Sequence, residues 1–164
     1  MQVFDESDLP SYVNWVEAGA VTPVKDQLHC GSCWAFSAVG ALESAHFIAS
    51  GELLSFSEQQ LIDCDIDAHC DGRLRQKGCH GGNMGYAFDY FEHNFAMLKD
   101  AYPYASGDTK SSGDCLYSAS KATNVKVVKS LRPLDKFPGS EGLKYGIQQQ
   151  PVSVAIAANN KYIH

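Results

Sequence analysis

Apolar residues recur at helical spacing between positions 34 and 42, and this is the clearest pattern in the chain. The periodic stretch predicts an α-helix over residues 32–50, with Ser32 as its N-cap residue and Gly51 as its C-terminal stop. An amphipathic helix buries its apolar face, so we expect this face to form the core of the surrounding lobe. Its apolar side chains are those of Trp34, Phe36, Val39 and Leu42.

Shorter patterned stretches lie on both sides of this helix. Residues 1–9 are acidic and without pattern, which favours an extended arm. Ser57 and Gln60 have the spacing of a capping box and predict a short helix that runs to Cys64. The other predictions are surface loops at 65–78 and 106–114, helices at 85–93 and 142–149, an alternating strand at 124–131 and a buried strand at 150–157.

Length, charge and cysteine content narrow the class of protein. The 164 residues suffice for one full domain or for most of a two-lobed one. The net charge of −6 argues against nucleic acid and anionic membranes as partners, and no apolar run approaches the ~18 residues of a membrane span. Six cysteines suit an oxidising compartment better than the cytosol. Nothing in the composition indicates a cofactor.

The strongest chemical signal is Cys-Gly-Ser-Cys-Trp at residues 30–34. Cys33 falls in the first turn of the predicted helix, where the helix dipole and unpaired backbone N–H groups favour a nucleophilic thiolate. Gln27 precedes it by a short segment and offers a side-chain N–H donor for an oxyanion. Gly31 allows the backbone to turn tightly in front of the nucleophile.

The C-x-x-C at Cys30 and Cys33 is also typical of a redox pair or half of a zinc site. A redox pair should follow a buried strand in a βαβ unit, and residues 22–27 do not have that pattern. A zinc site needs a second closely spaced pair, which the other four cysteines do not supply. The pattern therefore favours a nucleophilic cysteine.

These residues resemble the active-site segment of the papain and cathepsin L family of cysteine peptidases. Further resemblances are the Ser-Glu-Gln…Asp-Cys pattern of residues 57–64, Gly-Cys-x-Gly-Gly at 78–82, Tyr-Pro-Tyr at 102–104 and the Pro-Val-Ser-Val strand from 151. The resemblance implies an α+β fold of two lobes, with the helical first lobe complete and the β-barrel second lobe only partly present. It divides the chain into an arm at 1–10, a helical lobe at 11–122 and the start of the barrel lobe at 123–164.

The resemblance also implies roles for particular residues. Gln27 is then the oxyanion donor, and Cys33 is the nucleophile. The substrate-binding positions implied in this way are Gly31, Gly81 and Gly82 for the peptide backbone, and Met84 and Ala155 for the main specificity pocket. The implied disulfides are Cys30–Cys79 and Cys64–Cys115, which leaves Cys70 without an assigned partner.

The sequence lacks an assignable catalytic histidine and the asparagine that would orient it. His164 falls in the expected window of roughly 130–150 residues after the nucleophile, but the family's histidine follows well after the Pro-Val-Ser-Val strand, so His164 is not assigned. His29, His46, His69, His80 and His93 match no catalytic position. The chain is therefore expected to stop before the second lobe is complete.

The sequence is compatible with three functions. The first is an endopeptidase acting on peptides or proteins, with an apolar preference in its main pocket, possible control by protein inhibitors, and a lysosomal, vacuolar or extracellular location. The second is a truncated, inactive relative that binds peptides or inhibitors without turnover. The third, a purely structural disulfide-rich domain, gives no reason for Gln27 and Cys33 to be these residue types.

Overall fold

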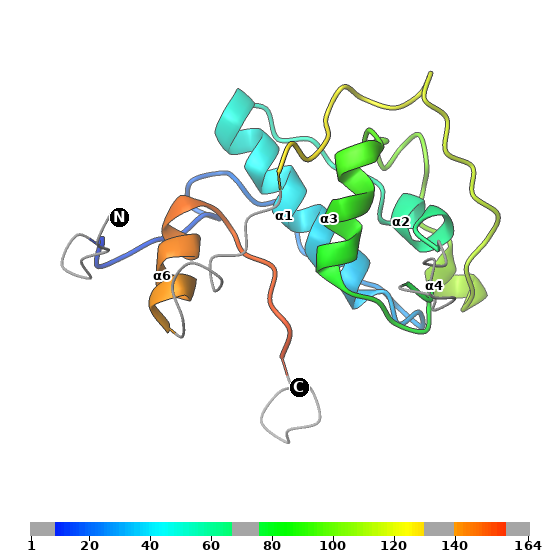
Figure 1. Ribbon diagram of the computed structural model, residues 1–164, viewed down its shortest axis with the longest axis horizontal. Coiled ribbons are helices and arrows are strands. Elements are labelled where there is room, and N and C mark those ends of the chain that lie inside the picture. Colours follow the sequence, from blue (N-terminus) through cyan, green and yellow to red (C-terminus); the bar gives the residue numbers. More distant parts are fainter. Residues whose placement is uncertain (1–8, 67–75, 130–139, 157–164) are drawn as a thin grey trace.

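A computed structural model describes residues 9–66, 76–129 and 140–156 (Figure 1). Within these ranges secondary structure is almost entirely helical, and β-structure is limited to isolated bridges such as Gly31 with His80 and Met97 with Ala122. The helices are α1 (Cys33–Ser50), α2 (Glu58–Cys64), α3 (Met84–His93), α4 (Ser106–Thr109) and α6 (Ser140–Gln149).

The core lies where α1 packs against α3 and α2 (Figure 1). Trp34, Val39 and Leu42 are buried there, which confirms the apolar face predicted for the long helix. Phe36 is the exception, because it is only half-buried and its ring meets the edge of Tyr104 at 5.0 Å between centroids. The other buried members of the core include Ala35, Ala38, Phe56, Leu61, Ile62, Ala87, Phe91 and Ala96.

The ends of α1 differ in how well the sequence predicted them. Gly51 adopts φ 80° and its N–H donates to the Phe47 carbonyl, so the predicted C-terminal stop is confirmed. Ser32 occupies the N-cap position but makes no side-chain cap hydrogen bond, so that part of the prediction is wrong. Its hydroxyl instead contacts Tyr104, a partner 72 residues away.

The predicted capping box of α2 is half formed. Ser57 Oγ accepts a hydrogen bond from the Gln60 N–H at 3.0 Å, as the motif requires. The Gln60 side chain does not return to the Ser57 N–H. Its amide bonds the backbone of Phe95 and Met97 instead, which ties α2 to the segment after α3.

Both predicted strands are wrong in the part of the chain that the structure describes. Residues 124–129 form no strand, and Val128 is 91% exposed. Residues 150–156 form no strand either, and Val154 and Ile156 are exposed. A strand needs backbone partners on a neighbouring strand, and the described residues offer none here. The predicted loop at 106–114 likewise differs, since it contains α4.

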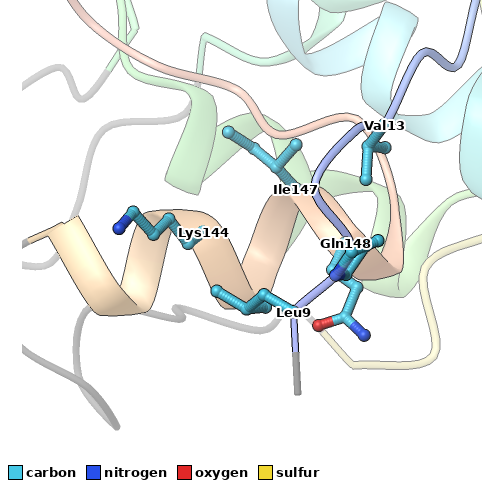
Figure 2. Close-up of a pocket in the computed structure, with 6 residues that line it drawn as sticks. Leu9, Val13, Lys144, Ile147 and Gln148 are labelled. Carbon is cyan, nitrogen blue, oxygen red and sulfur yellow. The ribbon is translucent and has the colours of Figure 1, made fainter. Parts of the chain in front are cut away.

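Helix α6 lies to one side of the α1–α3 pair and contacts the N-terminal segment (Figure 1). Its bounds confirm the helix predicted at 142–149, and Trp15 Nε1 donates to the Ile147 carbonyl at 2.7 Å. Leu9, Val13 and Lys144 help to line a cavity of about 350 Å³ between this segment and α6 (Figure 2). After α6, Ser153 Oγ donates to the Ser37 carbonyl and holds the chain beside α1.

A buried ion-pair cluster joins the segment before the nucleophile to α1 and α2. Lys25 Nζ lies 2.6 Å from a carboxylate oxygen of Glu43 and 2.6 Å from one of Glu58. The two glutamate side chains are 0% and 1% exposed, and Lys25 is 13% exposed. Glu43 also accepts hydrogen bonds from Thr22 and from the Phe56 N–H. The cluster therefore fixes the path of the chain that leads toward Cys33.

Two disulfides cross-link the helical body. Cys30 pairs with Cys79 and Cys64 pairs with Cys115, which are the two pairings implied by the family resemblance. Each closes a loop of about 50 residues, for which chain entropy contributes about 4 kcal/mol. Cys70 lies outside the described residues.

Candidate active site

Cys33 is a free, exposed thiol at the first position of α1. The N–H groups of Ala35 and Phe36 both donate to the Ser32 carbonyl, whereas the Cys33 N–H has no hydrogen-bond partner among the residues described. Unpaired N–H groups at a helix N-terminus stabilise nearby negative charge. The position therefore suits a thiolate, or an oxyanion that forms beside it.

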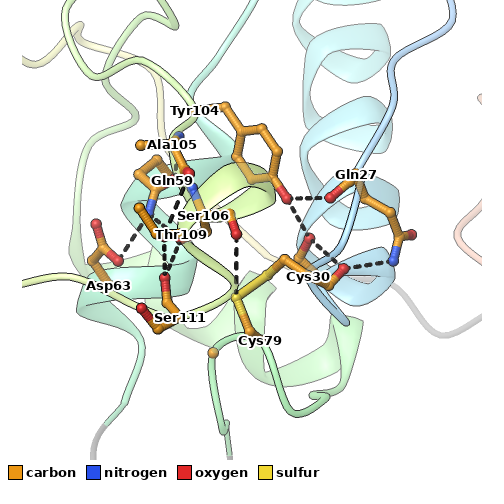
Figure 3. Close-up of a disulfide and its surroundings, with 12 residues drawn as sticks. Gln27, Cys30, Gln59, Asp63, Cys79, Tyr104, Ala105, Ser106, Thr109 and Ser111 are labelled. Atoms are coloured by element: carbon orange, nitrogen blue, oxygen red, sulfur yellow. Dashed lines mark hydrogen bonds between the residues drawn. A yellow bond between two sulfur atoms is a disulfide. The ribbon is translucent and has the colours of Figure 1, made fainter.

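Gln27 is held in the segment directly ahead of α1. Its side-chain Nε2 donates to the Cys30 carbonyl at 2.7 Å, and its backbone carbonyl accepts from the Tyr104 hydroxyl at 2.6 Å (Figure 3). A primary amide nitrogen carries two N–H groups. One is engaged with Cys30, and the second has no partner within the described part of the chain. The side chain is thus anchored while keeping one donor for another acceptor.

The Cys30–Cys79 disulfide brings the glycine-rich segment beside the nucleophile segment (Figure 3). Gly31 donates its N–H to the Cys79 carbonyl at 2.9 Å and forms a parallel bridge with His80. A side chain at Gly31 would approach that same carbonyl oxygen to 2.5 Å. The close backbone contact therefore requires glycine at this position.

Glycine is required at positions 81 and 82 for two different structural reasons, backbone conformation at the first and steric contact at the second. Gly81 adopts φ +105°, a backbone conformation that other residues rarely enter. A Cβ at Gly82 would lie 2.5 Å from the indole of Trp34 and would also collide with the Gln76 amide. Gly82 is exposed, so a substrate backbone could approach it, and its role as a substrate contact stays a prediction.

The two predicted pocket residues lie on different elements. Met84 is the first residue of α3, half-buried against the core. Ala155 is exposed in the extended segment after α6. Their participation in one specificity pocket stays a prediction.

Gln76 is a residue of this region that sequence reasoning missed. The polar stretch 65–78 was interpreted as a surface loop, but Gln76 is buried. Its amide bonds both the N–H and the carbonyl of Asn83, at 2.7 and 2.8 Å, and also Asp65 at 3.0 Å. Gln76 thereby braces the turn that carries Gly81 and Gly82. No local pattern marks it, because its partners become neighbours only in the folded chain.

Tyr104 is the second residue missed, and it contacts both sides of the nucleophile segment. Its hydroxyl reaches the Gln27 carbonyl and the Ser32 hydroxyl. Burial raises the pKa of this tyrosine above its ordinary value, an effect that the Ser32 hydrogen bond partly offsets and the charge of Glu58 reinforces. The hydroxyl thus stays protonated and able to donate. The Tyr-Pro-Tyr resemblance was the one sequence signal that included it.

No described histidine forms a hydrogen bond with the Cys33 thiol. His29, His80 and His93 are exposed, and His46 contacts Ser50 on α1. His69 and His164 lie outside the described residues. Within the same ranges, no set of three or more His, Cys, Asp or Glu side chains is arranged to hold a metal ion. No helix there is both long and apolar enough to cross a membrane.

The chain belongs to the papain family of cysteine proteases, whose sequence profile matches residues 9–164. It is 41% identical over 159 residues to cysteine proteinase 15A of Pisum sativum, covering 95% of this chain and 42% of that protein. It is 50% identical over 102 residues to a cathepsin L-like peptidase of Aedes aegypti, covering 62% of this chain and 28% of that protein.

A solved structure supports the same fold. The cysteine protease CMS1MS2 of Carica candamarcensis, in complex with E-64, matches with a TM-score of 0.59 and 40% identity over 73% of this chain and 49% of that one. The fold is therefore papain-like. The chain spans about two-fifths of the length of the relatives that match most of it.

Proposed function

We propose that this chain carries the nucleophile half of a cysteine endopeptidase active site. The observation that carries the proposal is a free, exposed Cys33 at a helix N-terminus, with the Gln27 amide anchored just ahead of it. In the proposed reaction the thiolate attacks the carbonyl carbon of a peptide bond. The negative charge moves to the carbonyl oxygen, which accepts hydrogen bonds from the free Gln27 N–H and the Cys33 N–H.

The tetrahedral intermediate then collapses with loss of the amine, which leaves with a proton, and a thioester on Cys33 remains. Water hydrolyses this acyl-enzyme to the acid and restores the thiol. A histidine is needed to protonate the leaving amine, and none of the described residues takes that role. We therefore place that group outside the described residues.

The proposed substrate preference rests on the residues that the family resemblance assigns to substrate binding. The backbone of Gly82 pairs with an extended peptide, and Met84 and Ala155 line a pocket that prefers an apolar side chain. A polar side chain would lose its hydration there without gaining partners. Profiling with peptide libraries is expected to show apolar enrichment at this subsite, and enrichment of a charged residue would remove the assignment.

The disulfides support action in an oxidising or endolysosomal compartment, meaning a lysosome, a vacuole or the extracellular space. The solved relative was determined in complex with E-64, so we expect E-64 and protein inhibitors of cysteine peptidases to bind this chain.

An activated ester tests the proposal on the chain itself. A p-nitrophenyl ester of an N-acylated Phe-Ala dipeptide has a leaving group that needs no protonation, so acylation of Cys33 should release nitrophenolate in a burst of about one equivalent. Cys33→Ser should abolish the burst. Gln27→Ala should slow it by ten-fold or more, because loss of an oxyanion donor typically costs about 10²–10³ in rate. Gln148→Ala, a change at α6, is the matched control.

A non-catalytic peptide-binding protein is the second candidate. It is favoured by the absence of a described histidine hydrogen-bonded to the Cys33 thiol. Such a protein would bind the ester peptide without a burst, and the proposal of a working nucleophile would then be wrong.

A further inference from the structure

The Tyr104 hydroxyl contacts the segment that leads to Cys33 at two points, and one of them, the Gln27 carbonyl, is drawn in Figure 3. It lies 2.6 Å from the carbonyl of Gln27, the proposed oxyanion donor, and 3.1 Å from Oγ of Ser32, the residue directly before Cys33. These contacts span 77 and 72 positions of sequence. One side chain from a distant segment therefore touches both ends of the turn that precedes the nucleophile.

The direction of each hydrogen bond follows from counting protons. Tyr104 has a single hydroxyl hydrogen, and the Gln27 carbonyl can only accept, so Tyr104 donates to Gln27. In the contact with Ser32 the serine hydroxyl is therefore the donor to the tyrosine oxygen at 3.1 Å, and its second acceptor, the Cys30 carbonyl, is farther away at 3.4 Å. The three groups form a directed chain from Ser32 through Tyr104 to Gln27, in which each bond polarises and strengthens the next.

Tyr104 is itself firmly anchored. The edge of its ring meets Phe36 of α1, and the next residue, Ala105, donates its N–H to the Gln59 side chain on α2 at 2.8 Å. Farther along, the Gly107 carbonyl accepts the N–H of His29. The segment from 104 to 107 thus lies against residues 27–32 and is attached to two helices.

We infer that Tyr104 is a positioning residue for this site, whose hydroxyl fixes the backbone of Gln27 relative to the start of α1. The catalytic consequence rests on the proposed function, whereas the effect on the order of residues 27–33 does not. Without the hydroxyl, Ser32 loses an acceptor and the Gln27 carbonyl keeps only a 3.4 Å contact with the Cys30 N–H. The oxyanion donor would then sample positions away from the reacting carbonyl.

The chain contains a matched control two residues away. Tyr102 is buried, whereas Tyr104 is half-buried, and the Tyr102 hydroxyl bonds Asp63 and the Leu116 N–H, away from the nucleophile segment. Tyr104→Phe and Tyr102→Phe remove the same atom from the same Tyr-Pro-Tyr stretch while keeping both rings. Thermal melting of both variants reports any general loss of stability.

The first readout is amide hydrogen exchange of the peptide covering residues 26–35. Tyr104→Phe should accelerate exchange there about five-fold, the effect of losing one ordinary hydrogen bond, and Tyr102→Phe should leave it unchanged. The second readout is the nitrophenyl ester burst, which Tyr104→Phe should slow by a similar factor. Alkylation by iodoacetamide, which forms no oxyanion, should change less than the burst.

Equal behaviour of the two variants in exchange at 26–35 overturns the inference. Faster exchange in Tyr104→Phe with an unchanged burst limits Tyr104 to a structural role and also overturns its positioning function. If the wild-type chain gives no burst at all, the proposed function fails, and the exchange comparison alone decides whether Tyr104 orders the segment.

Discussion

Replacing Lys25 by methionine tests the buried ion-pair cluster that directs the chain toward the nucleophile. Among the described residues, Lys25 is the cation that contacts both Glu43 and Glu58, and both carboxylates are almost fully buried. Removing one partner of a buried ion pair typically costs about 3–5 kcal/mol, because a charge is left without compensation. We expect Lys25→Met to lower the free energy of unfolding by about that amount.

The two glutamates should not share this cost equally. Without Lys25, Glu43 keeps hydrogen bonds from Thr22 Oγ1 and from the Phe56 N–H. Glu58 Oε2 has no partner in the described structure, and Lys25 is the partner seen for Oε1. The uncompensated charge therefore falls mainly on Glu58. Adding Glu58→Gln to Lys25→Met should recover about 2 kcal/mol, and adding Glu43→Gln should recover less.

Urea unfolding of the disulfide-intact chain, analysed at constant slope, measures these differences. Lys121→Met, at an exposed lysine, is the control and should stay within about 0.5 kcal/mol of the wild type. A Lys25→Met chain within 1 kcal/mol of the wild type would refute the reasoning. Equal rescue by the two glutamine substitutions would refute the assignment of the cost to Glu58.

Two further predictions concern packing and titration. Gly82→Ala places a Cβ against the Trp34 indole and should lower stability by about 1–3 kcal/mol in urea unfolding, whereas Gly40→Ala, with open space at its Cβ, should not destabilise. Burial raises the pKa of Tyr102 to about 12, so its contribution to stability is present below pH 10 and is lost as the pH rises through 12. Ultraviolet titration should show a late step whose amplitude falls by one tyrosine in Tyr102→Phe, with Tyr104, whose pKa is also raised, still titrating late. An unchanged amplitude in that variant would contradict the assignment.

The helices were predictable because their signals are local. The apolar spacing from Trp34 to Leu42 and the stop at Gly51 are contained within one stretch of sequence, and α1 has those bounds. The failed predictions depended on partners elsewhere in the chain. Ser32 has the side chain of a good N-cap residue, but Tyr104 engages its hydroxyl.

The strands failed for a related reason. Alternation at 124–129 predicts a strand, but the backbone there bonds Phe91 in α3 and Ala96 just beyond that helix rather than a neighbouring strand. In the site, Cys33 and Gln27 could be proposed from the motif, since the proposed nucleophile and oxyanion donor lie within one short stretch of sequence. Tyr104 and Gln76 could not, because each acts through contacts that only the fold creates.

The central claim is that this chain presents Cys33 as an activated nucleophile. The most direct test is the rate of iodoacetamide alkylation of Cys33 between pH 4 and pH 9, followed by peptide mapping and compared with glutathione as a reference thiol. An ordinary cysteine reacts with a midpoint near pH ~8.5. The account predicts that Cys33 is labelled faster than glutathione under matched conditions. A rate that follows glutathione across the whole range would contradict it.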